Sequence, residues 1–189
     1  MLVVTGPSGA GKGTLIRELF RRVPEVEVTV SATTRERRPG EENGREYWFL
    51  PRDEFQRRID AGDFLEWVEY VSGHRYGTLR SELGRIRDAG HLPLLELETE
   101  GALRVKEDVR DAVTIFISAP VEELERRLTE RATESAGEIG ERIELARRQL
   151  LQADEFDYVI ENDDLGAAVD KLTELVRNLL APAATMPRR

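Results

Sequence analysis

The chain has 189 residues, a length that suits one compact domain with a core of its own. Hydrophobic residues make up 40% and charged residues 34% of the chain, which is typical of a globular protein and excludes wholesale disorder. The net charge of -9 argues against general binding to a nucleic acid polymer or an anionic membrane. An anionic ligand would therefore need a local cluster of arginines.

The sequence contains no cysteine, which excludes disulfides and zinc-thiolate sites and fits a reducing compartment. It turns from Met-Leu-Val-Val straight into a glycine loop, without the pattern of a secretory signal. No apolar run approaches the ~18 residues of a membrane span. We therefore expect a cytoplasmic protein that acts away from membranes and without an obligate protein partner.

Apolar periodicity in the first half predicts a strand at residues 2–4, a helix carrying Leu15 and Leu19, and a small β-rich insertion over about residues 31–78. Within that insertion, the polar stretch 31–43 predicts a long loop. The other elements predicted there and just before it are strands at 26–30, 47–50, 64–70 and around 76–78, and a short helix from 51 to about 62.

The second half alternates strands with helices, a pattern that favours a parallel sheet with right-handed crossovers and ligands at the carboxyl ends of the strands. Two charged helical stretches between 121 and 153 are expected to break around 133–137, and residues 181–189 are expected to be disordered. The predicted elements are a helix at 79–90, strands at 92–97, 113–117 and 158–160, and a final helix at 165–180.

A glycine-rich loop joins the first strand to the first helix. Its residues are Gly6, Pro7, Ser8, Gly9, Ala10, Gly11, Lys12, Gly13 and Thr14. This GxxxxGK pattern predicts a P-loop, in which backbone N–H groups and the helix N-terminus hold phosphate and Lys12 reaches the β- and γ-phosphates of ATP. Gly13 stands where Ser or Thr is usual, so Mg²⁺ ligation from this loop would involve Thr14 through water.

The stretch from Ser31 to Tyr47 clusters arginines, hydroxyls and a phenol outside any amphipathic pattern. Arginine forks bind phosphate oxygens in pairs, and a tyrosine hydroxyl adds a neutral donor. The stretch suits a second phosphate site, although a solvated charged loop is the alternative for runs of this kind.

This stretch resembles the signature of the guanylate kinase family, in which S-x-T-T-R, a second arginine, P/A-G-E, N/H-G and a tyrosine follow in this order. The P-loop, Phe64-Leu65-Glu66-Trp67 and Tyr76-Gly77-Thr78 are similar to the family in sequence and spacing, and the likeness extends to about Leu180. It implies an α/β three-layer P-loop NTPase fold with a parallel sheet, a GMP-binding insertion and a helical lid over about residues 121–145. A single domain would then span residues 1–180, with its core at 1–30 and 79–180.

The resemblance also implies roles for individual residues. The GMP site would comprise Ser31, Arg35, Arg38, Glu41, Tyr47, Glu66, Tyr76, Thr78 and Glu98. The ATP site would add Arg127, Arg131 and Asn162 to the P-loop, and Lys12, Arg38, Arg131 and Arg142 would be catalytic. Mg²⁺ would accompany ATP.

Glu66 also suits guanine on chemical grounds. Guanine presents N1–H and an exocyclic amine as adjacent donors, and an ionised carboxylate accepts with both oxygens. Adenine would leave the carboxylate partly unpaired, a mismatch that gives high specificity. Without the resemblance, an outward-facing strand residue would be the simpler interpretation.

The acids at the end of the strand predicted at 92–97 depart from the family's usual D-x-D-x-Q-G, because Glu96, Glu98 and Glu100 occupy the positions of the two aspartates and the glutamine. We expect Glu98 to contact the base and Glu96 to hold magnesium or serve the structure, with Glu100 either a ligand or an ordinary acid at a strand end. The added methylene shifts each carboxylate by about one bond length.

The resulting hypothesis is phosphoryl transfer from ATP to GMP, giving ADP and GDP. A non-catalytic guanylate kinase-like module that binds protein ligands is one alternative, and a P-loop kinase with another acceptor is the second. The intact P-loop disfavours the first alternative, and Glu66 with the Ser31–Tyr47 signature disfavours the second.

Overall fold

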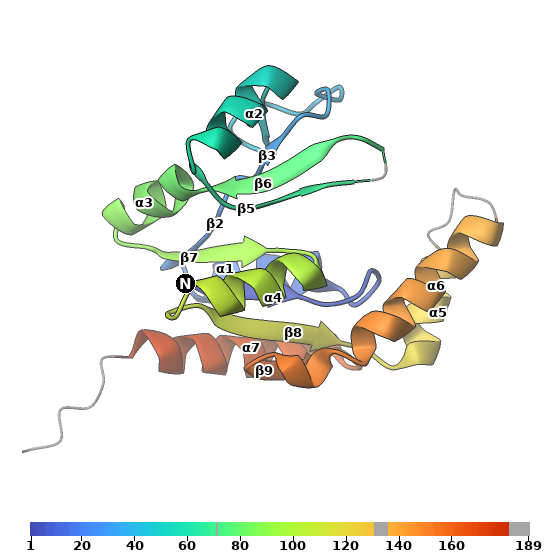
Figure 1. The fold of residues 1–189 in the computed structure, drawn as a ribbon. Helices are drawn as coiled ribbons and strands as arrows, with labels where there is room; N and C mark the ends of the chain where they lie inside the picture. Colours follow the sequence, from blue (N-terminus) through green and yellow to red (C-terminus); the bar gives the residue numbers. More distant parts are fainter. Residues whose placement is uncertain (71, 131–135, 182–189) are drawn as a thin grey trace, which may run out of the picture. The chain divides into compact units, whose positions relative to one another are not determined.

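The computed structural model describes residues 1–70, 72–130 and 136–181 (Figure 1). The chain separates into two compact units. The first unit contains Met1–Thr5 and Glu25–Ile115, and the second contains Gly6–Pro24 and the chain from Phe116 onward. Each unit is therefore built from segments that are distant in sequence.

The larger sheet has five strands, in the order β2 (Val26–Val28), β7 (Leu92–Glu96), β1 (Leu2–Thr5), β8 (Val113–Ser118) and β9 (Tyr158–Glu161). In the first unit, β7 runs parallel to both β1 and β2, with Leu94 opposite Leu2 and Val28. All four residues of β1 are buried, as expected for a parallel strand covered on both faces. The predicted α/β class with a parallel sheet is confirmed.

A smaller sheet of four strands occupies the predicted insertion, in the order β4 (Trp48–Phe49), β3 (Ala32–Thr33), β6 (Arg75–Leu79) and β5 (Phe64–Glu69). β3 lies inside the stretch that the sequence predicted as a loop. Ala32 and Thr33 are fully buried because they pair with β6 on one side and β4 on the other. Two residues are too few for a periodic signal, so only the pairing defines this strand.

Three helices belong to the first unit: α2 (Arg52–Asp60), α3 (Arg80–Asp88) and α4 (Thr99–Asp108). In Figure 1, α2 lies over the smaller sheet, where Phe55 packs with Ala32, Phe64 and Leu79. Helix α3 packs on β6 and β7, and α4 packs on β1 and β5. The smaller sheet therefore has a core of its own, centred on Phe55.

The second unit contains α1 (Lys12–Arg22), α5 (Val121–Glu130), α6 (Ala136–Leu150), a 3-10 turn (Ala153–Glu155) and α7 (Leu165–Leu180). α1 packs on α7 and α5 packs on α6. The break expected at 133–137 falls largely outside the described residues, and α6 already includes 136 and 137. None of the helices in the described ranges combines the length and the apolar character that a membrane crossing requires.

We predict that Phe55→Ala lowers the free energy of unfolding by about 3–5 kcal/mol, because it leaves a cavity in the core of the smaller sheet. Phe55 is fully buried and its ring stacks on that of Phe64, with the centroids 4.4 Å apart. Urea unfolding would measure the loss. Leu151→Ala is the control, since Leu151 is 86% exposed and its loss should change stability by less than about 0.5 kcal/mol. Equal effects would contradict this description of the core.

Candidate functional site

The glycine loop that precedes α1 has a backbone that side chains would obstruct. Gly6, Gly9 and Gly11 have φ angles of 138°, 89° and 86°, a region that L-residues with a Cβ rarely adopt. A Cβ on Gly6 would lie 2.1 Å from the carbonyl oxygen of Ile117. The glycines at these positions are therefore required by the path of the chain.

The loop ends at the N-terminus of α1, which carries no side-chain cap. Gly11 is the N-cap residue, no side chain accepts a hydrogen bond from the first turn, and the first turn contains no acidic residue. The amides and the dipole of the helix make such an end favourable for an anion. This arrangement is that of a phosphate site.

Lys12 folds back over this loop. Its Nζ donates hydrogen bonds to the carbonyl oxygens of Gly6, at 2.6 Å, and Pro7, at 3.2 Å. The ammonium group thus lies against the loop backbone, where it can also reach an anion held by the loop amides.

Two side chains hold the outer carbonyls of the loop. Asn162 Nδ2 donates to the Ala10 carbonyl at 2.7 Å, and Arg127 NH1 donates to the Gly9 carbonyl at 3.2 Å. In a trans peptide the C=O and N–H groups point in opposite directions. Holding the Ala10 carbonyl therefore fixes the direction of the Gly11 amide.

The arginines expected to contact ATP occupy different places. Arg127 contacts the loop backbone, as described above, and an ion pair with Glu123 at 2.6 Å orients it. Arg142 in α6 donates to Ser8 Oγ at 2.9 Å, so it lies at the rim of the loop. Arg131 lies outside the described residues.

The described residues contain no group of three or more His, Cys, Asp or Glu side chains that could hold a metal ion. The position after Lys12 is the exposed Gly13, which has no donor atom, and Thr14 Oγ1 accepts a hydrogen bond from Arg17 at 3.3 Å. Magnesium takes phosphate oxygens and water readily and needs few protein ligands. The residues here fit a cation that arrives with the nucleotide.

The first unit holds the second cluster predicted from the sequence, centred on Arg35. Its guanidinium forms a two-pronged ion pair with Glu41, with N–O distances of 2.8 and 3.1 Å, and only 12% of the Arg35 side chain is exposed. Glu41 also accepts the backbone N–H of Arg38 at 2.8 Å. The bonds from Arg35 and then Arg38 hold the pKa of Glu41 below its usual range. Glu41 therefore fixes one arginine by its side chain and the next by its backbone.

Aromatic rings surround this ion pair. The Arg35 guanidinium carbon lies 5.4 Å from the ring centre of Tyr47 and 5.6 Å from that of Phe49. Tyr76 packs edge-to-face against Tyr47 at 5.8 Å and against Tyr70 at 5.1 Å. Burial raises the pKa of Tyr47 above its usual value and that of Tyr70 to about 12, so both phenols stay neutral donors.

Glu66 and Thr78 lie opposite each other on β5 and β6. Burial raises the pKa of Glu66 above its usual value, and the nearby Thr78 offsets part of that rise. Thr78 Oγ1 is buried and makes no well-formed hydrogen bond within the described residues. A carboxylate with unused acceptor capacity and an unsatisfied hydroxyl suit a ligand with several adjacent donors.

The remaining predicted residues are spread along the first unit. Ser31 precedes β3, and its carbonyl accepts the Trp48 N–H at 2.9 Å. Glu96 ends β7 and is exposed, while Glu98 is the N-cap residue of α4. Glu100 lies in the first turn of α4, where the helix dipole favours an acid, so its position has a structural reason.

Sequence reasoning missed Phe49 and Tyr70. Both are aromatic residues of β-rich segments, and in the sequence alone this pattern indicates no more than ordinary strand packing. Only the fold places Phe49 under Arg35 and Tyr70 against Tyr76.

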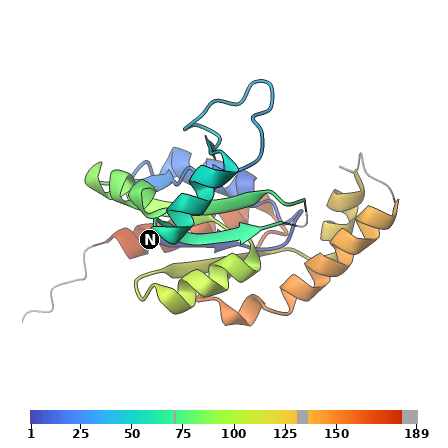
Figure 2. The same cartoon turned by 45° about the horizontal axis from the view of Figure 1, so that its top comes forward.

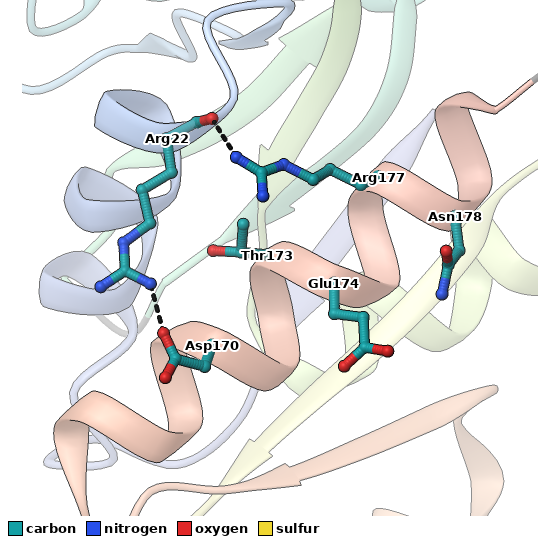
Figure 3. A pocket seen from close by; sticks show the side chains of 6 residues that line it. All are labelled: Arg22, Asp170, Thr173, Glu174, Arg177 and Asn178. Carbon is teal, nitrogen blue, oxygen red and sulfur yellow. Dashed lines mark hydrogen bonds and ion pairs between the residues drawn. The ribbon is translucent and has the colours of Figure 1, made fainter.

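A surface cavity of about 500 Å³ lies between α1 and α7 in the second unit (Figure 3). Arg22 at its edge pairs with Asp170 at 2.5 Å, and Arg177 donates to the Arg22 carbonyl at 3.1 Å. Arg22 ends α1, about 15 Å along the helix from Lys12. These contacts join the two helices, and the cavity is separate from the phosphate loop.

The fold and the glycine loop define a P-loop nucleotide-binding protein, and the Arg35 cluster lies on its smaller sheet. The family model for guanylate kinase matches residues 1–179. The chain therefore belongs to the guanylate kinase family.

Individual relatives agree with this family. The chain is 47% identical to a guanylate kinase of Rubrobacter xylanophilus over 182 residues, which cover 96% of this chain and 95% of that protein. It is 44% identical to a guanylate kinase of Desulfitobacterium hafniense, covering 100% and 93%. A crystal structure of guanylate kinase from Anaplasma phagocytophilum superposes with a TM-score of 0.73 at 30% identity, covering 97% and 87%.

We predict that Gly11→Ala lowers the free energy of unfolding by about 1–3 kcal/mol, because a Cβ at positive φ is strained. The new Cβ would also lie 2.4 Å from Asn162 Nδ2. Gly13→Ala is the matched control, since Gly13 has open space around it and alanine favours a helix by up to ~1 kcal/mol. Thermal unfolding of the nucleotide-free proteins would compare them, and similar losses in both would contradict this loop geometry.

Proposed function

We propose that this protein catalyses the transfer of the γ-phosphoryl group of ATP to GMP, giving ADP and GDP. The observation that carries this proposal is the pairing of Glu66 with Thr78 on the same small sheet that holds the Arg35 cluster. Such a sheet offers a phosphate site and an acceptor-rich edge for guanine within one unit. Membership of the guanylate kinase family supports the same reaction.

In this reaction the GMP phosphate oxygen attacks the γ-phosphorus of ATP, a new P–O bond forms, and the bond to the β–γ bridging oxygen breaks with ADP as the leaving group. The attacking phosphate is already largely ionised at neutral pH, so no side-chain nucleophile is needed. When bound, Mg²⁺ would neutralise charge on the phosphates of ATP.

The chain supplies binding and positive charge in this scheme. The loop amides hold the ATP phosphates, and Lys12 exchanges the carbonyls of Gly6 and Pro7 for phosphate oxygens. Arg142, at the rim of the loop, adds charge to the transferred group. Arg131 is expected to act with it on the ground of the family resemblance alone.

The acceptor would be held by Arg35, Arg38, Tyr47 and Tyr76 through its phosphate and by Glu66 and Thr78 through its base. The exposed Arg38 side chain can turn onto a phosphate while its backbone stays fixed by Glu41. Ser31 and Glu98 complete the proposed base site, and Glu96 or Thr14 would contact magnesium through water.

The alternatives are not favoured. A scaffold-like module has no need for three glycines at positive φ and a lysine in a phosphate loop. A kinase with another acceptor gives no role to the partly buried Glu66. We place the reaction in the cytoplasm as a step of purine nucleotide metabolism, because ATP and GMP are its substrates.

The substrate assignment predicts a marked preference for GMP. A coupled assay would follow ADP release from Mg-ATP with GMP, AMP, CMP and UMP in parallel. We expect kcat/KM for GMP to exceed that for AMP by at least about 10³-fold, because adenine leaves the Glu66 and Thr78 positions unpaired. Equal rates with all four acceptors would overturn the proposed substrate.

The raised pKa of Glu66 predicts a pH-dependent effect of Glu66→Gln on the nucleotide-free protein. Because burial disfavours the charged form, the wild type bears a cost at any pH above the folded-state pKa, and that cost vanishes once the carboxyl is protonated in both states. The glutamine variant should therefore be more stable than wild type at pH 8, with the difference lost below about pH 4.

Glu69→Gln is the matched control on the same strand. Hydrogen bonds from Arg75 first, and then Arg52, lower the pKa of Glu69, so its replacement should cost stability at pH 8. Urea unfolding at both pH values would test the pair. A loss of stability in Glu66→Gln at pH 8 would contradict the assigned effect of burial.

A further inference from the structure

We propose that Glu82 and Trp48 form an anchor that positions the acceptor phosphate site, and that the anchor sets affinity for GMP without taking part in ATP binding. Neither residue belongs to the sites described above. The inference rests on the proposed function for the identity of the acceptor, while its geometry stands on contacts within the first unit.

Side chains alternate in direction along residues 47–49, the segment that leads into β4. Successive side chains of an extended segment point to opposite sides, and the rings of Tyr47 and Phe49 pack together with centroids 5.9 Å apart, so Trp48 between them points to the other side. Tyr47 and Phe49 are the two rings that lie against Arg35. A contact that holds Trp48 on the opposite side therefore also restrains Tyr47 and Phe49, the neighbours that pack against Arg35.

Trp48 is fixed by a buried carboxylate. Its indole Nε1 donates to Glu82 Oε2 at 2.9 Å, and Glu82 lies in the first turn of α3 with only 3% of its surface exposed. A buried carboxylate is costly unless hydrogen bonds satisfy it. The hydrogen bond to Glu82 therefore stabilises the orientation of Trp48 in which its indole N–H points at the carboxylate.

The charge of Glu82 has its own partner on α3. Arg85 Nε donates to Glu82 Oε1 at 2.7 Å, and Arg85 NH2 also donates to Glu27 Oε1 at 2.6 Å. His91 Nδ1 lies 2.8 Å from the other oxygen of Glu27. The anchor is thus tied to β2 and to the start of β7, the part of the first unit that belongs to the larger sheet.

The other edge of the indole contacts the segment that joins β3 to β4, residues 34–47, called the arginine loop below. Gly44 has a φ of 83°, and a Cβ there would lie 2.8 Å from Trp48 Cη2 and Cζ3. Gly44 N also donates to the Tyr47 carbonyl at 2.9 Å. The indole therefore supports the loop directly before Tyr47.

The indole contact at Gly44 lies at the end of a loop whose middle is exposed. Residues 36–40 are all exposed, and Figure 2 shows the loop extending beyond the strands at its two ends. Because few side chains of this loop are buried, its conformation depends on a small set of contacts. Loss of one such contact should displace the proposed phosphate site more than it displaces the core. The structure assigns the Trp48–Glu82 bond as such a contact.

Trp48→Phe tests the anchor by removing the N–H donor while keeping an aromatic ring. We expect KM for GMP, and the Kd for GMP in the absence of ATP, to rise about tenfold, the size set by a lost hydrogen bond to a charged group. KM for ATP and kcat should stay within about twofold of wild type. Calorimetry would measure the Kd, and the coupled assay the kinetic constants.

Glu82→Gln is the second variant, because it keeps the size of the side chain and weakens only the charge-assisted bonds. We expect a smaller rise in the Kd for GMP, about threefold. Because both changes act on one bond, Trp48→Phe combined with Glu82→Gln should bind GMP no more weakly than Trp48→Phe alone.

Trp67→Phe is the matched control. Trp67 is the other tryptophan of the chain, lies on β5 of the same sheet, and is 37% exposed. Among the described residues, its ring contact is with Arg75 and not with Trp48 or Glu82. The Kd for GMP and the KM values for GMP and ATP should therefore remain at wild-type values.

Unchanged GMP binding in a folded Trp48→Phe protein would overturn the proposal, as would equal rises in KM for GMP and ATP. If Trp48→Phe does not fold, Glu82→Gln decides by the same criteria. A wild type that binds GMP without phosphorylating it would refute the proposed reaction and leave the anchor to be judged on Kd. A wild type that does not bind GMP would overturn both.

Discussion

Backbone N–H groups can bind an anion only where the neighbouring carbonyl oxygens, which carry negative partial charge, point away from it. The phosphate loop depends on this constraint. Asn162 and Arg127 hold the carbonyls of Ala10 and Gly9, and the glycines allow the turns that result. Asn162 is itself buried, and its N–H donates to the Ser118 carbonyl at the end of β8. The direction of the loop amides is thus set by Asn162 at the end of β9, which is itself held by Ser118 at the end of β8.

At the Arg35 cluster, side chains rather than the backbone hold the positive charge in place. The chain carries a net charge of -9, and several of its arginines form ion pairs on helix surfaces, such as Arg126 with Glu123 and Glu130. Such exposed pairs contribute little to stability. Arg35 differs because it is mostly enclosed by rings and by Glu41. A protein with a negative net charge can therefore still hold a guanidinium at a fixed place. Here Glu41 orients the Arg35 guanidinium, and the neighbouring rings shield it from solvent.

Much of this could be predicted from the sequence. The glycine pattern, the apolar runs at residues 2–4 and 92–97, and the helix from residue 165 all gave local signals that the structure confirms. β3 gave none, because two buried residues are defined only by partners 16 and 43–45 positions away. The Trp48–Glu82 bond joins residues 34 apart through a tertiary contact. Arg127 is predicted to contact ATP, and the structure adds that it donates to the loop backbone and pairs with Glu123, contacts that sequence periodicity does not reveal.

Gly77 on β6 has an ordinary backbone conformation, yet a Cβ there would lie 2.7 Å from the Glu66 carbonyl oxygen and 2.8 Å from Trp67 Cβ. A shift of one residue between β5 and β6 would put Tyr76 or Thr78 into that gap and reverse the faces of every side chain. The glycine therefore excludes the neighbouring alignments and keeps Glu66 opposite Thr78. Evolution can therefore alter the chemistry at these two positions only by exchanging the side chains, since a shift of the strands past each other is opposed by steric overlap at Gly77.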